Sequence, residues 1–343
     1  MDLFSGVGSL TLGVWEAARR HHHGLKPLAV DVDTRPLRVY AHNFPQAEVV
    51  AQDLTAMLDG ELNSRPTERE KRFIRYVGPI WTLLSGSPCQ GFCPLNNYTR
   101  GRDRRNRLYL RATRLAELAQ PTNLLFENIP DVVNGDIDVV ELTTATLREQ
   151  GYHVDSGTID LAEMGLPQHR RRHVVVASLN ASPSIPRVIS KYKVKNPRTV
   201  KWAIADLESK CPSSSFDTPS ELSPENRGRI RYLHRNGEYD LPDSKRPRCH
   251  RNGNHSYGSM YGRLHYDLPA QTITSGFTSP GQGRFVHPSH ERTLTPHEAA
   301  RLQFFPDFFD FTPAPNRSAL KEMIGNAAPM KLSYAFAMEY FMG

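Results

Sequence analysis

Cys89 is the residue whose type and position most clearly suggest chemistry. It follows the apolar run Ile80 to Leu84, which predicts a buried strand, and it stands in the segment GSPCQ of residues 86–90. In α/β proteins, ligands bind beside the carboxyl ends of strands. A lone cysteine is commonly a small core residue, but the proline, glutamine and glycine around this one disfavour burial. The position therefore predicts a nucleophilic thiol.

Charged side chains flank two further apolar runs. Glu127 follows the run Asn123 to Phe126, where its carboxyl group can donate a proton to a ring nitrogen. Arg170 and Arg172 precede the run His173 to Ala177, and alternate residues entering a strand point the same way. Two interpretations stay open: a charged entry to the strand, or a side chain, Arg172, that binds the carbonyl oxygen of a pyrimidine.

A glycine turn lies near the amino end of the chain. Gly6 and Gly8 stand in the segment DLFSGVGSL of residues 2–10, where they let the backbone press against a bound cofactor. Asp31 ends the next apolar run, and an acidic side chain there can accept hydrogen bonds from two ribose hydroxyls. Together these features predict a nucleoside cofactor. A nicotinamide-dependent oxidoreductase shares them, but it leaves the segment around Cys89 unexplained.

The elements that must position these residues are short apolar runs alternating with amphipathic stretches. Leu28 to Val30 and the three runs above are typical of buried strands, and helical patterns cover Leu108 to Ala119 and Val139 to Gln150. This alternation predicts an α/β fold with a doubly wound, mostly parallel sheet. Periodicity fades between Ser182 and Tyr261, which predicts a smaller, irregular second domain, and a helical pattern from Met330 to Phe341 closes the chain.

The net charge of +7 is concentrated in one part of the chain. Residues 187–251 hold 15 Lys and Arg against 8 Asp and Glu, a difference equal to the net charge of the whole chain. Such an excess is typical of a polyphosphate-binding surface, with a solvated surface as the alternative. Four cysteines without a CxxC pair argue against a disulfide framework and a zinc site. No apolar run approaches the roughly 20 residues of a membrane span.

Six motifs stand in the order typical of DNA cytosine-5 methyltransferases, and the sequence resembles that family over nearly its whole length. The motifs are FSGVG at 4–8, PCQ at 88–90, ENI at 127–129, QxRxR at 168–172, PxxTIT at 269–274 and GNAAP at 325–329. The resemblance implies a Rossmann-like catalytic and cofactor-binding domain at residues 1–182 and a target-recognition region at 183–262. Residues 263–343 are then the end of the recognition lobe and the return to the catalytic domain.

The resemblance also implies a role for each candidate residue. Cys89 is the expected nucleophile, Glu127 and Arg172 hold a flipped cytosine, and Arg170 supports the loop. The expected contacts with S-adenosylmethionine are Phe4, Gly6, Gly8, Asp31, Val32, Asp53, Leu54, Asn326 and Ala327. The expected partner is double-stranded DNA, bound by a monomer without a metal ion. The expected location is the cytoplasm, at the nucleoid in a bacterium, or the nucleus in a eukaryote.

Two alternatives stay open within this architecture. An RNA (tRNA) cytosine-5 methyltransferase would share the catalytic residues, although the long basic segment favours DNA. A catalytically weak DNA-binding relative is the other alternative, because only Met1 precedes Asp2 and the first strand is expected to be short. The target DNA sequence cannot be inferred, since recognition loops have no transferable code.

Overall fold

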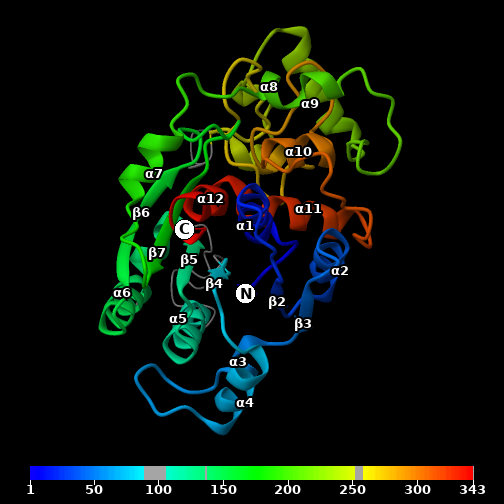
Figure 1. The fold of residues 1–343 in the computed structure, drawn as a ribbon. Coiled ribbons are helices and arrows are strands. Elements are labelled where there is room, and N and C mark those ends of the chain that lie inside the picture. Colours follow the sequence, from blue (N-terminus) through cyan, green and yellow to red (C-terminus); the bar gives the residue numbers. More distant parts are fainter. Residues whose placement is uncertain (89–105, 136, 252–257, 343) are drawn as a thin grey trace. The chain divides into compact units, whose positions relative to one another are not determined.

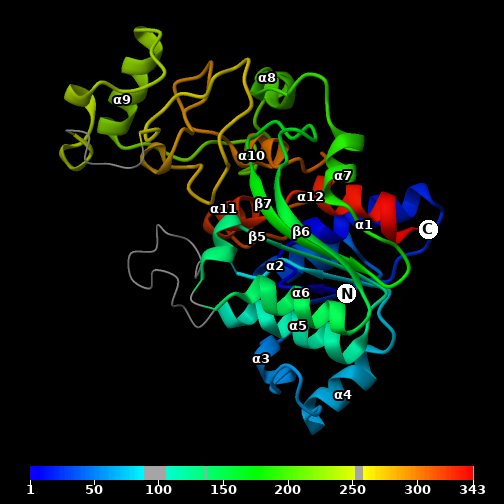
Figure 2. The same ribbon diagram turned by 90° about the vertical axis from the view of Figure 1, so that its left-hand side faces the viewer.

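The computed structural model describes residues 1–88, 106–135, 137–251 and 258–342. Seven strands form one sheet in the order β3-β2-β1-β4-β5-β7-β6. Among them β7 alone runs antiparallel to its neighbours, and the other paired strands are parallel. The strands are β1 (Asp2–Leu3), β2 (Leu28–Asp31), β3 (Glu48–Ala51), β4 (Thr82–Ser85), β5 (Asn123–Asn128), β6 (His153–Asp160) and β7 (Arg171–Ser178). The predicted α/β fold with a doubly wound, mostly parallel sheet is confirmed (Figure 1 and Figure 2).

Helices connect the strands and build the second part of the chain. In the described ranges they are α1 (Ser9–Arg20), α2 (Thr34–Asn43), α3 (Leu54–Met57), α4 (Glu68–Val77), α5 (Arg107–Ala119), α6 (Val139–Glu149), α7 (Ile185–Tyr192), α8 (Val200–Ile204), α9 (Pro224–Arg235), α10 (Pro296–Leu302), α11 (Arg317–Asn326) and α12 (Met330–Phe336). A π-helical turn, Ala337–Phe341, continues α12. Within the part of the chain that the structure describes, no helix is long and apolar enough to cross a membrane.

The apolar runs predicted to be strands correspond to β2, β4, β5 and β7, and the two predicted internal helices are α5 and α6. The stretch 182–261, predicted to be irregular, instead contains the three helices α7, α8 and α9. Two of them have only eight and five residues, too few for a clear helical period. The third, α9, has 12 residues but buries only two of them, Ile230 and Leu233.

Strand side chains alternate between two faces of the sheet. Leu3, Leu83 and Leu124 belong to one core cluster, which α3, α5 and α6 complete. Their neighbours along the strands, such as Leu84 and Leu125, are also buried and point to the opposite face. Helices α1, α2 and α12 cover that face (Figure 1 and Figure 2). Burial on both faces explains why these strands read as continuous apolar runs.

Helices α1 and α12 approach each other closely at a glycine. The Ser333 hydroxyl of α12 donates to the carbonyl of Leu10 in α1 at 2.7 Å. A methyl group added at Gly13 would clash with the Ser333 Oγ and with the Met330 carbonyl oxygen. The end of the chain is thereby packed against the helix that follows the glycine turn.

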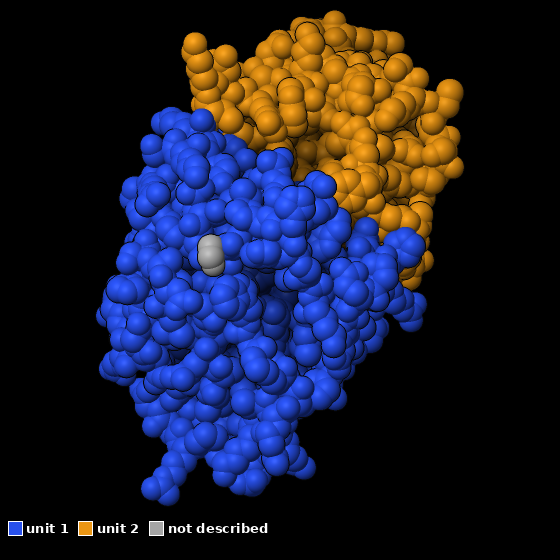
Figure 3. Space-filling model, in the orientation of Figure 1, with its two compact units in different colours: residues 1–164, 171–193, 328–343 blue, residues 165–170, 194–327 orange. Residues whose placement is uncertain are grey.

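The chain divides into two compact units, which Figure 3 shows in blue and orange. Unit 1 comprises residues 1–164, 171–193 and 328–343 and holds the sheet, and unit 2 comprises residues 165–170 and 194–327. Helix α7 therefore belongs to the unit that contains the sheet, and α8 to α11 belong to unit 2. The assignment of residues 183–262 to target recognition stays a prediction, because compactness does not report function.

Gly13→Ala should lower the free energy of unfolding by about 1–3 kcal/mol, because the added methyl group overpacks α1 against α12. Chemical denaturation measures this change as a lower midpoint. Gly24→Ala is the matched control, since no described atom lies within 4 Å of the position of its Cβ. Equal midpoints for Gly13→Ala and wild type would show that the two helices do not meet at this glycine.

Candidate functional site

The candidate site begins at the turn that joins β1 to α1. Phe4 and Gly6 both have a φ of 53°, and Gly8 has a φ of 87°, a left-handed conformation that favours glycine. The N–H of Gly6 donates to Oδ2 of Asp31 at 2.9 Å. The N–H of Asp33 donates to the other oxygen of the same carboxylate, also at 2.9 Å. Asp31 therefore holds the glycine turn against the end of β2.

The glycine turn is supported from α2. A methyl group at Gly8 would lie 2.6 Å from the ring of Tyr40, so only glycine permits this approach. The Tyr40 hydroxyl donates to Oγ1 of Thr11 at 2.8 Å, and the Thr11 hydroxyl donates to Oδ2 of Asp2 at 2.7 Å. Burial raises the pKa of Asp2 to about 7, although the Thr11 hydrogen bond opposes this shift. The buried chain of hydrogen bonds ties β1, α1 and α2 together around the turn.

The surroundings of Asp31 fit the ribose of a nucleoside. Burial raises the pKa of its carboxyl group, and the N–H groups of Asp33 and Gly6 offset this only in part. Each carboxylate oxygen keeps a lone pair for a hydroxyl donor. Val32 is 72% exposed and offers an apolar side chain beside the carboxylate. No described atom lies within 4 Å of the Cβ position at Gly6, so the space beside the turn is open.

Two further predicted contacts, Asp53 and Leu54, stand at the start of α3. Asp53 is exposed and caps the helix, since Oδ1 accepts hydrogen bonds from the N–H and the hydroxyl of Thr55 at 2.8 Å. Leu54 is buried in the core, so a ligand can meet its main chain but not its side chain. The Gln52 N–H donates to the carbonyl of Asp31 at 3.1 Å, which brings this segment beside the ribose-binding candidate.

Glu127 and Arg172 come together from the adjacent strands β5 and β7. Nε of Arg172 lies 2.5 Å from Oε1 of Glu127, and the two side chains are 11% and 9% exposed. A methyl group at Gly86 would lie 3.9 Å from Oε2 of Glu127 and 3.9 Å from the carbonyl oxygen of Phe4. Gly86 therefore stands between the ion pair and the glycine turn, with Oε2 as the carboxylate oxygen turned toward it.

Asn128 holds the start of the loop that follows β4. Its Nδ2 donates to the carbonyl and hydroxyl oxygens of Ser87 at 3.2 and 3.0 Å, and its Oδ1 accepts from the Ile129 N–H at 2.8 Å. Ser87 stands two residues before Cys89 in the sequence. Cys89, the predicted nucleophile, lies outside the described residues. The sequence points to Asn128 only as part of a motif, and its role in ordering Ser87 emerges from the structure.

Arg170 is buried in unit 2, where its guanidinium group donates hydrogen bonds to carbonyls of two distant segments. Nη1 donates to the Ile273 carbonyl at 2.9 Å, and Nη2 donates to the Ala327 carbonyl at 2.9 Å and to that of Gly325 at 3.4 Å. This geometry is compatible with the loop-supporting role that the resemblance implies for Arg170. Asn326, a predicted cofactor contact, is exposed at the end of α11 between two of these carbonyls.

Two buried glutamines complete this network, and the sequence does not single them out as site residues. Nε2 of Gln168 donates to the Leu302 carbonyl at 2.8 Å and to Oε1 of Gln303 at 2.9 Å, and its Oε1 accepts from the Ile273 N–H at 2.9 Å. Nε2 of Gln303 donates to the Ile324 carbonyl at 2.8 Å. Gln168 belongs to a recognised motif, whereas Gln303 has no distinctive spacing by which the sequence could reveal it.

One group of possible metal ligands occurs among the described residues: Glu208, His287 and His290, whose ligand atoms lie within 4.8 Å of one another. Nδ1 of His287 accepts hydrogen bonds from the N–H groups of Ser289 and His290, both at 3.1 Å. This assigns the ring proton to Nε2, which lies 3.4 Å from Oε1 of Glu298. An N–H group offers no lone pair to a metal ion, so the arrangement fits a contact with the carboxylate.

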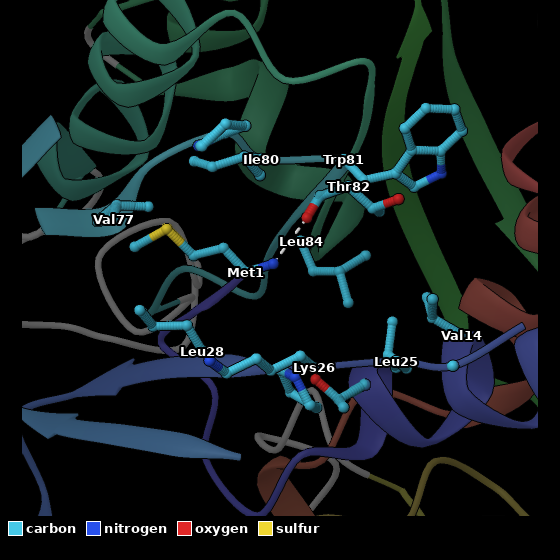
Figure 4. Close-up of a pocket in the computed structure, with 14 residues that line it drawn as sticks. Met1, Val14, Leu25, Lys26, Leu28, Val77, Ile80, Trp81, Thr82 and Leu84 are labelled. Atoms are coloured by element: carbon cyan, nitrogen blue, oxygen red, sulfur yellow. Dashed lines mark hydrogen bonds between the residues drawn. The ribbon is translucent and has the colours of Figure 1, made fainter. Parts of the chain in front are cut away.

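A cavity of about 280 Å³ lies at the amino ends of the parallel strands, opposite the candidate site (Figure 4). Its lining includes Met1, Leu28 and Ile80, at or before the amino ends of β1, β2 and β4. Asp31 and Glu127 stand at the carboxyl ends of parallel strands, where α/β proteins bind ligands. The cavity is therefore separate from the candidate site.

Comparisons with known proteins agree with one another. The family model described as C-5 cytosine-specific DNA methylase matches residues 1–341. The chain is 44% identical over 340 residues to the type II methyltransferase M1.BsuMI of Bacillus subtilis (strain 168), covering 98% of this chain and 79% of that protein. It is 29% identical to the type II methylase M.HgiDII of Herpetosiphon aurantiacus, covering 98% of this chain and 93% of that protein.

Solved structures with low sequence identity share the fold. A DNA modification methyltransferase encoded within an E. coli prophage matches with a TM-score of 0.65 at 24% identity, over 98% of this chain and 96% of that chain. The S. pombe Dnmt2 methyltransferase matches with a TM-score of 0.62 at 18% identity, over the same shares of the two chains. The arrangement of the elements is therefore common to these proteins.

Asp31→Ala should weaken S-adenosylmethionine binding about tenfold or more, because it removes the predicted hydrogen-bond acceptor for the ribose and the anchor of Gly6. Isothermal titration calorimetry measures the change. Asp33→Ala is the control: Asp33 caps α2 by accepting from the Arg35 N–H at 2.8 Å. This control should cost about 1 kcal/mol of stability and leave cofactor affinity unchanged. An equal loss of affinity in both variants would assign the effect to the start of α2 instead.

Proposed function

The chain belongs to the family of C-5 cytosine-specific DNA methylases, and we propose that it transfers a methyl group from S-adenosylmethionine to carbon-5 of a cytosine in double-stranded DNA. The observation that carries the proposal is the Glu127–Arg172 pair, held at 2.5 Å. Gly86 separates this pair from the turn that Asp31 anchors. A cytosine at this edge of the sheet would meet a carboxyl group and a guanidinium group beside a nucleoside-binding turn.

Residues of the glycine turn and the neighbouring strand ends are proposed to hold the cofactor. Asp31 accepts the ribose hydroxyls, and the exposed Val32 packs against a ring. Asp53 and the main chain of Leu54 stand next along the same edge, and Phe4, Gly6 and Gly8 shape the turn. Asn326 and Ala327 stay predicted contacts. When bound, S-adenosylmethionine supplies an electrophilic methyl group.

The chain's own residues are proposed to make cytosine reactive. Carbon-5 of cytosine is a poor nucleophile until a thiolate adds to carbon-6, and we assign that addition to Cys89. Glu127, in its protonated form, offsets the resulting negative charge by donating a proton to the ring nitrogen, and Arg172 stabilises the same charge by binding the carbonyl oxygen. After carbon-5 has been methylated, a base removes its proton. The electrons of that bond re-form the double bond and expel the Cys89 thiolate.

The proposal includes base flipping, because none of these cytosine atoms is reachable inside a duplex. Extruding a base costs a few kcal/mol, which contacts with the DNA backbone must offset. The basic excess of residues 187–251 supports such contacts. A monomer that acts on DNA in the cytoplasm, or in a nucleus if the source has one, belongs to the same proposal.

Plasmid DNA from cells that express the protein should carry 5-methylcytosine at the copies of one short sequence, as read by bisulfite sequencing. Plasmid from cells that express Cys89→Ser should stay unmodified at those positions, because a serine hydroxyl supplies almost no anion near neutral pH. A parallel assay with purified protein compares duplex DNA with tRNA. Methyl transfer to tRNA alone would replace the DNA proposal with the RNA alternative, and cofactor binding without any transfer would favour a catalytically weak relative.

A duplex with 5-fluorocytosine at the target position should trap the enzyme covalently, because fluorine cannot leave carbon-5 as a cation after methylation. The complex should survive denaturing electrophoresis and form only when S-adenosylmethionine is present. Cys89→Ser should abolish it, and Glu127→Gln should slow it, since an amide cannot donate a proton as an acid does. Cys93 stands four residues after Cys89 in the sequence, so Cys93→Ser is the matched control and should trap like wild type. Loss of trapping in that control, with trapping kept in Cys89→Ser, would identify Cys93 as the nucleophile.

A further inference from the structure

Helix α9 (Pro224–Arg235) has one face in unit 2 and another in solvent. Ile230 and Leu233 are fully buried and pack in a cluster with Leu241 and Val286. Each residue of an α-helix is rotated by about 100° from the one before it. On this basis, one set of side chains lies away from Ile230 and Leu233 and covers an arc of about 100° around the helix axis. That set is exposed and consists of Pro224 in the first turn together with Arg227, Gly228, Arg231 and Arg235.

Other arginines of the basic segment are used inside unit 2. Arg229, on the inner side of α9, lies over the ring of Tyr261 at 5.4 Å and donates to the Lys245 carbonyl at 3.3 Å. Arg246 donates to the Leu241 carbonyl at 2.9 Å, and Arg251 donates to the Arg246 carbonyl at 2.9 Å. These guanidinium groups brace loops, so several of their hydrogen-bond donors are already used inside unit 2.

The arginines on the outer face of α9 have few partners of their own, although Nη2 of Arg227 donates to the Leu222 carbonyl at 3.5 Å. Among the described residues, no carboxylate pairs with Arg227 or Arg235, and Arg231 lies 3.3 Å from Glu291 in an ion pair whose side chains are both exposed. Exposed pairs of this kind contribute little stability. Arg227 and Arg235 are separated by about 12 Å along the helix axis, with Arg231 between them. The face is thus a row of available cations.

Gly228 stands in the middle of this row without a reason in the fold of the chain. Glycine in a helix interior is less favourable than alanine, and no described atom lies within 4 Å of the position of its Cβ. Its φ lies outside the left-handed region, so the backbone does not demand glycine there either. Gly228 therefore leaves the helix backbone uncovered at this position, with room for a group from outside the chain.

We infer that the outer face of α9, formed by Arg227, Gly228, Arg231 and Arg235, docks on the phosphate backbone of double-stranded DNA. This inference rests on the proposed function, since it names the surface by which the enzyme holds its substrate. Three cations in a row match a polyanion and do not match an apolar partner. The missing side chain at Gly228 lets the sugar-phosphate chain lie against the helix, with arginines on either side of it.

Gly228→Ala separates this inference from a structural role, because it should change stability and binding in opposite directions. The melting temperature should rise by about 2 °C, since alanine favours the helix and its methyl group meets open space. Affinity for a fluorescent duplex of arbitrary sequence, measured by anisotropy, should fall about threefold or more as the methyl group holds the backbone away. A variant that is more stable and binds DNA as well as wild type would overturn the close approach at Gly228.

Neutralising the row tests its charge. The triple variant Arg227→Gln, Arg231→Gln, Arg235→Gln should reduce the slope of log affinity against log salt by about 2 to 3, because each phosphate contact contributes about one unit. Arg72→Gln, at an exposed position of α4, makes the same substitution elsewhere and should leave the slope unchanged. S-adenosylmethionine affinity should be equal in all variants. If wild type binds duplex DNA and the triple variant keeps its slope, this inference is wrong while the proposed function stands; if wild type binds no duplex, both are overturned.

Discussion

A tight turn leaves backbone N–H groups without partners in a helix or strand. The candidate site depends on the hydrogen bond that the Gly6 N–H, in the turn after β1, makes with Asp31. The carboxylate of Asp31 accepts from the N–H of Gly6 and fastens the turn to the neighbouring strand. Strand β1 has only two residues, so this bond and the ladder to β2 and β4 hold it between those two strands. Gly8 can then rest on Tyr40, and α1 begins with its backbone already placed.

A second constraint governs unit 2, where buried carbonyl groups must find donors. Arg170 supplies them to Ile273 and Ala327, which lie 103 and 157 residues further along the chain. Gln168 and Gln303 satisfy further main-chain groups of the same segments. Buried polar groups stabilise a fold only when they are paired, so the three segments are held in one arrangement. Motifs that look independent in the sequence are therefore parts of one hydrogen-bonded network.

The arginines of the basic segment, residues 187–251, do not all have the same role. A guanidinium group has five N–H donors. Arg229, Arg246 and Arg251 each donate hydrogen bonds to main-chain carbonyls within unit 2. A smaller set of arginines on α9 remains available to a partner. The net charge of +7 therefore includes guanidinium groups that also stabilise the fold of unit 2.

Apolar periodicity by itself determined the α/β class, because a strand buried on both faces must be apolar along its length. It also placed Asp31 and Glu127 at strand ends, since carboxyl ends of parallel strands share one edge. The order of six motifs identified the family, which the matching family model confirms.

Only the tertiary structure decided which side chains meet. Pairing of β5 with β7 set the Glu127–Arg172 contact, and crossing of distant segments placed Gln303 beside Gln168. It also decided that the stretch around α9 is helical, because two buried side chains give too weak a period to detect in the sequence. Contacts between residues far apart in the chain depend on strand register and packing, which local sequence does not encode.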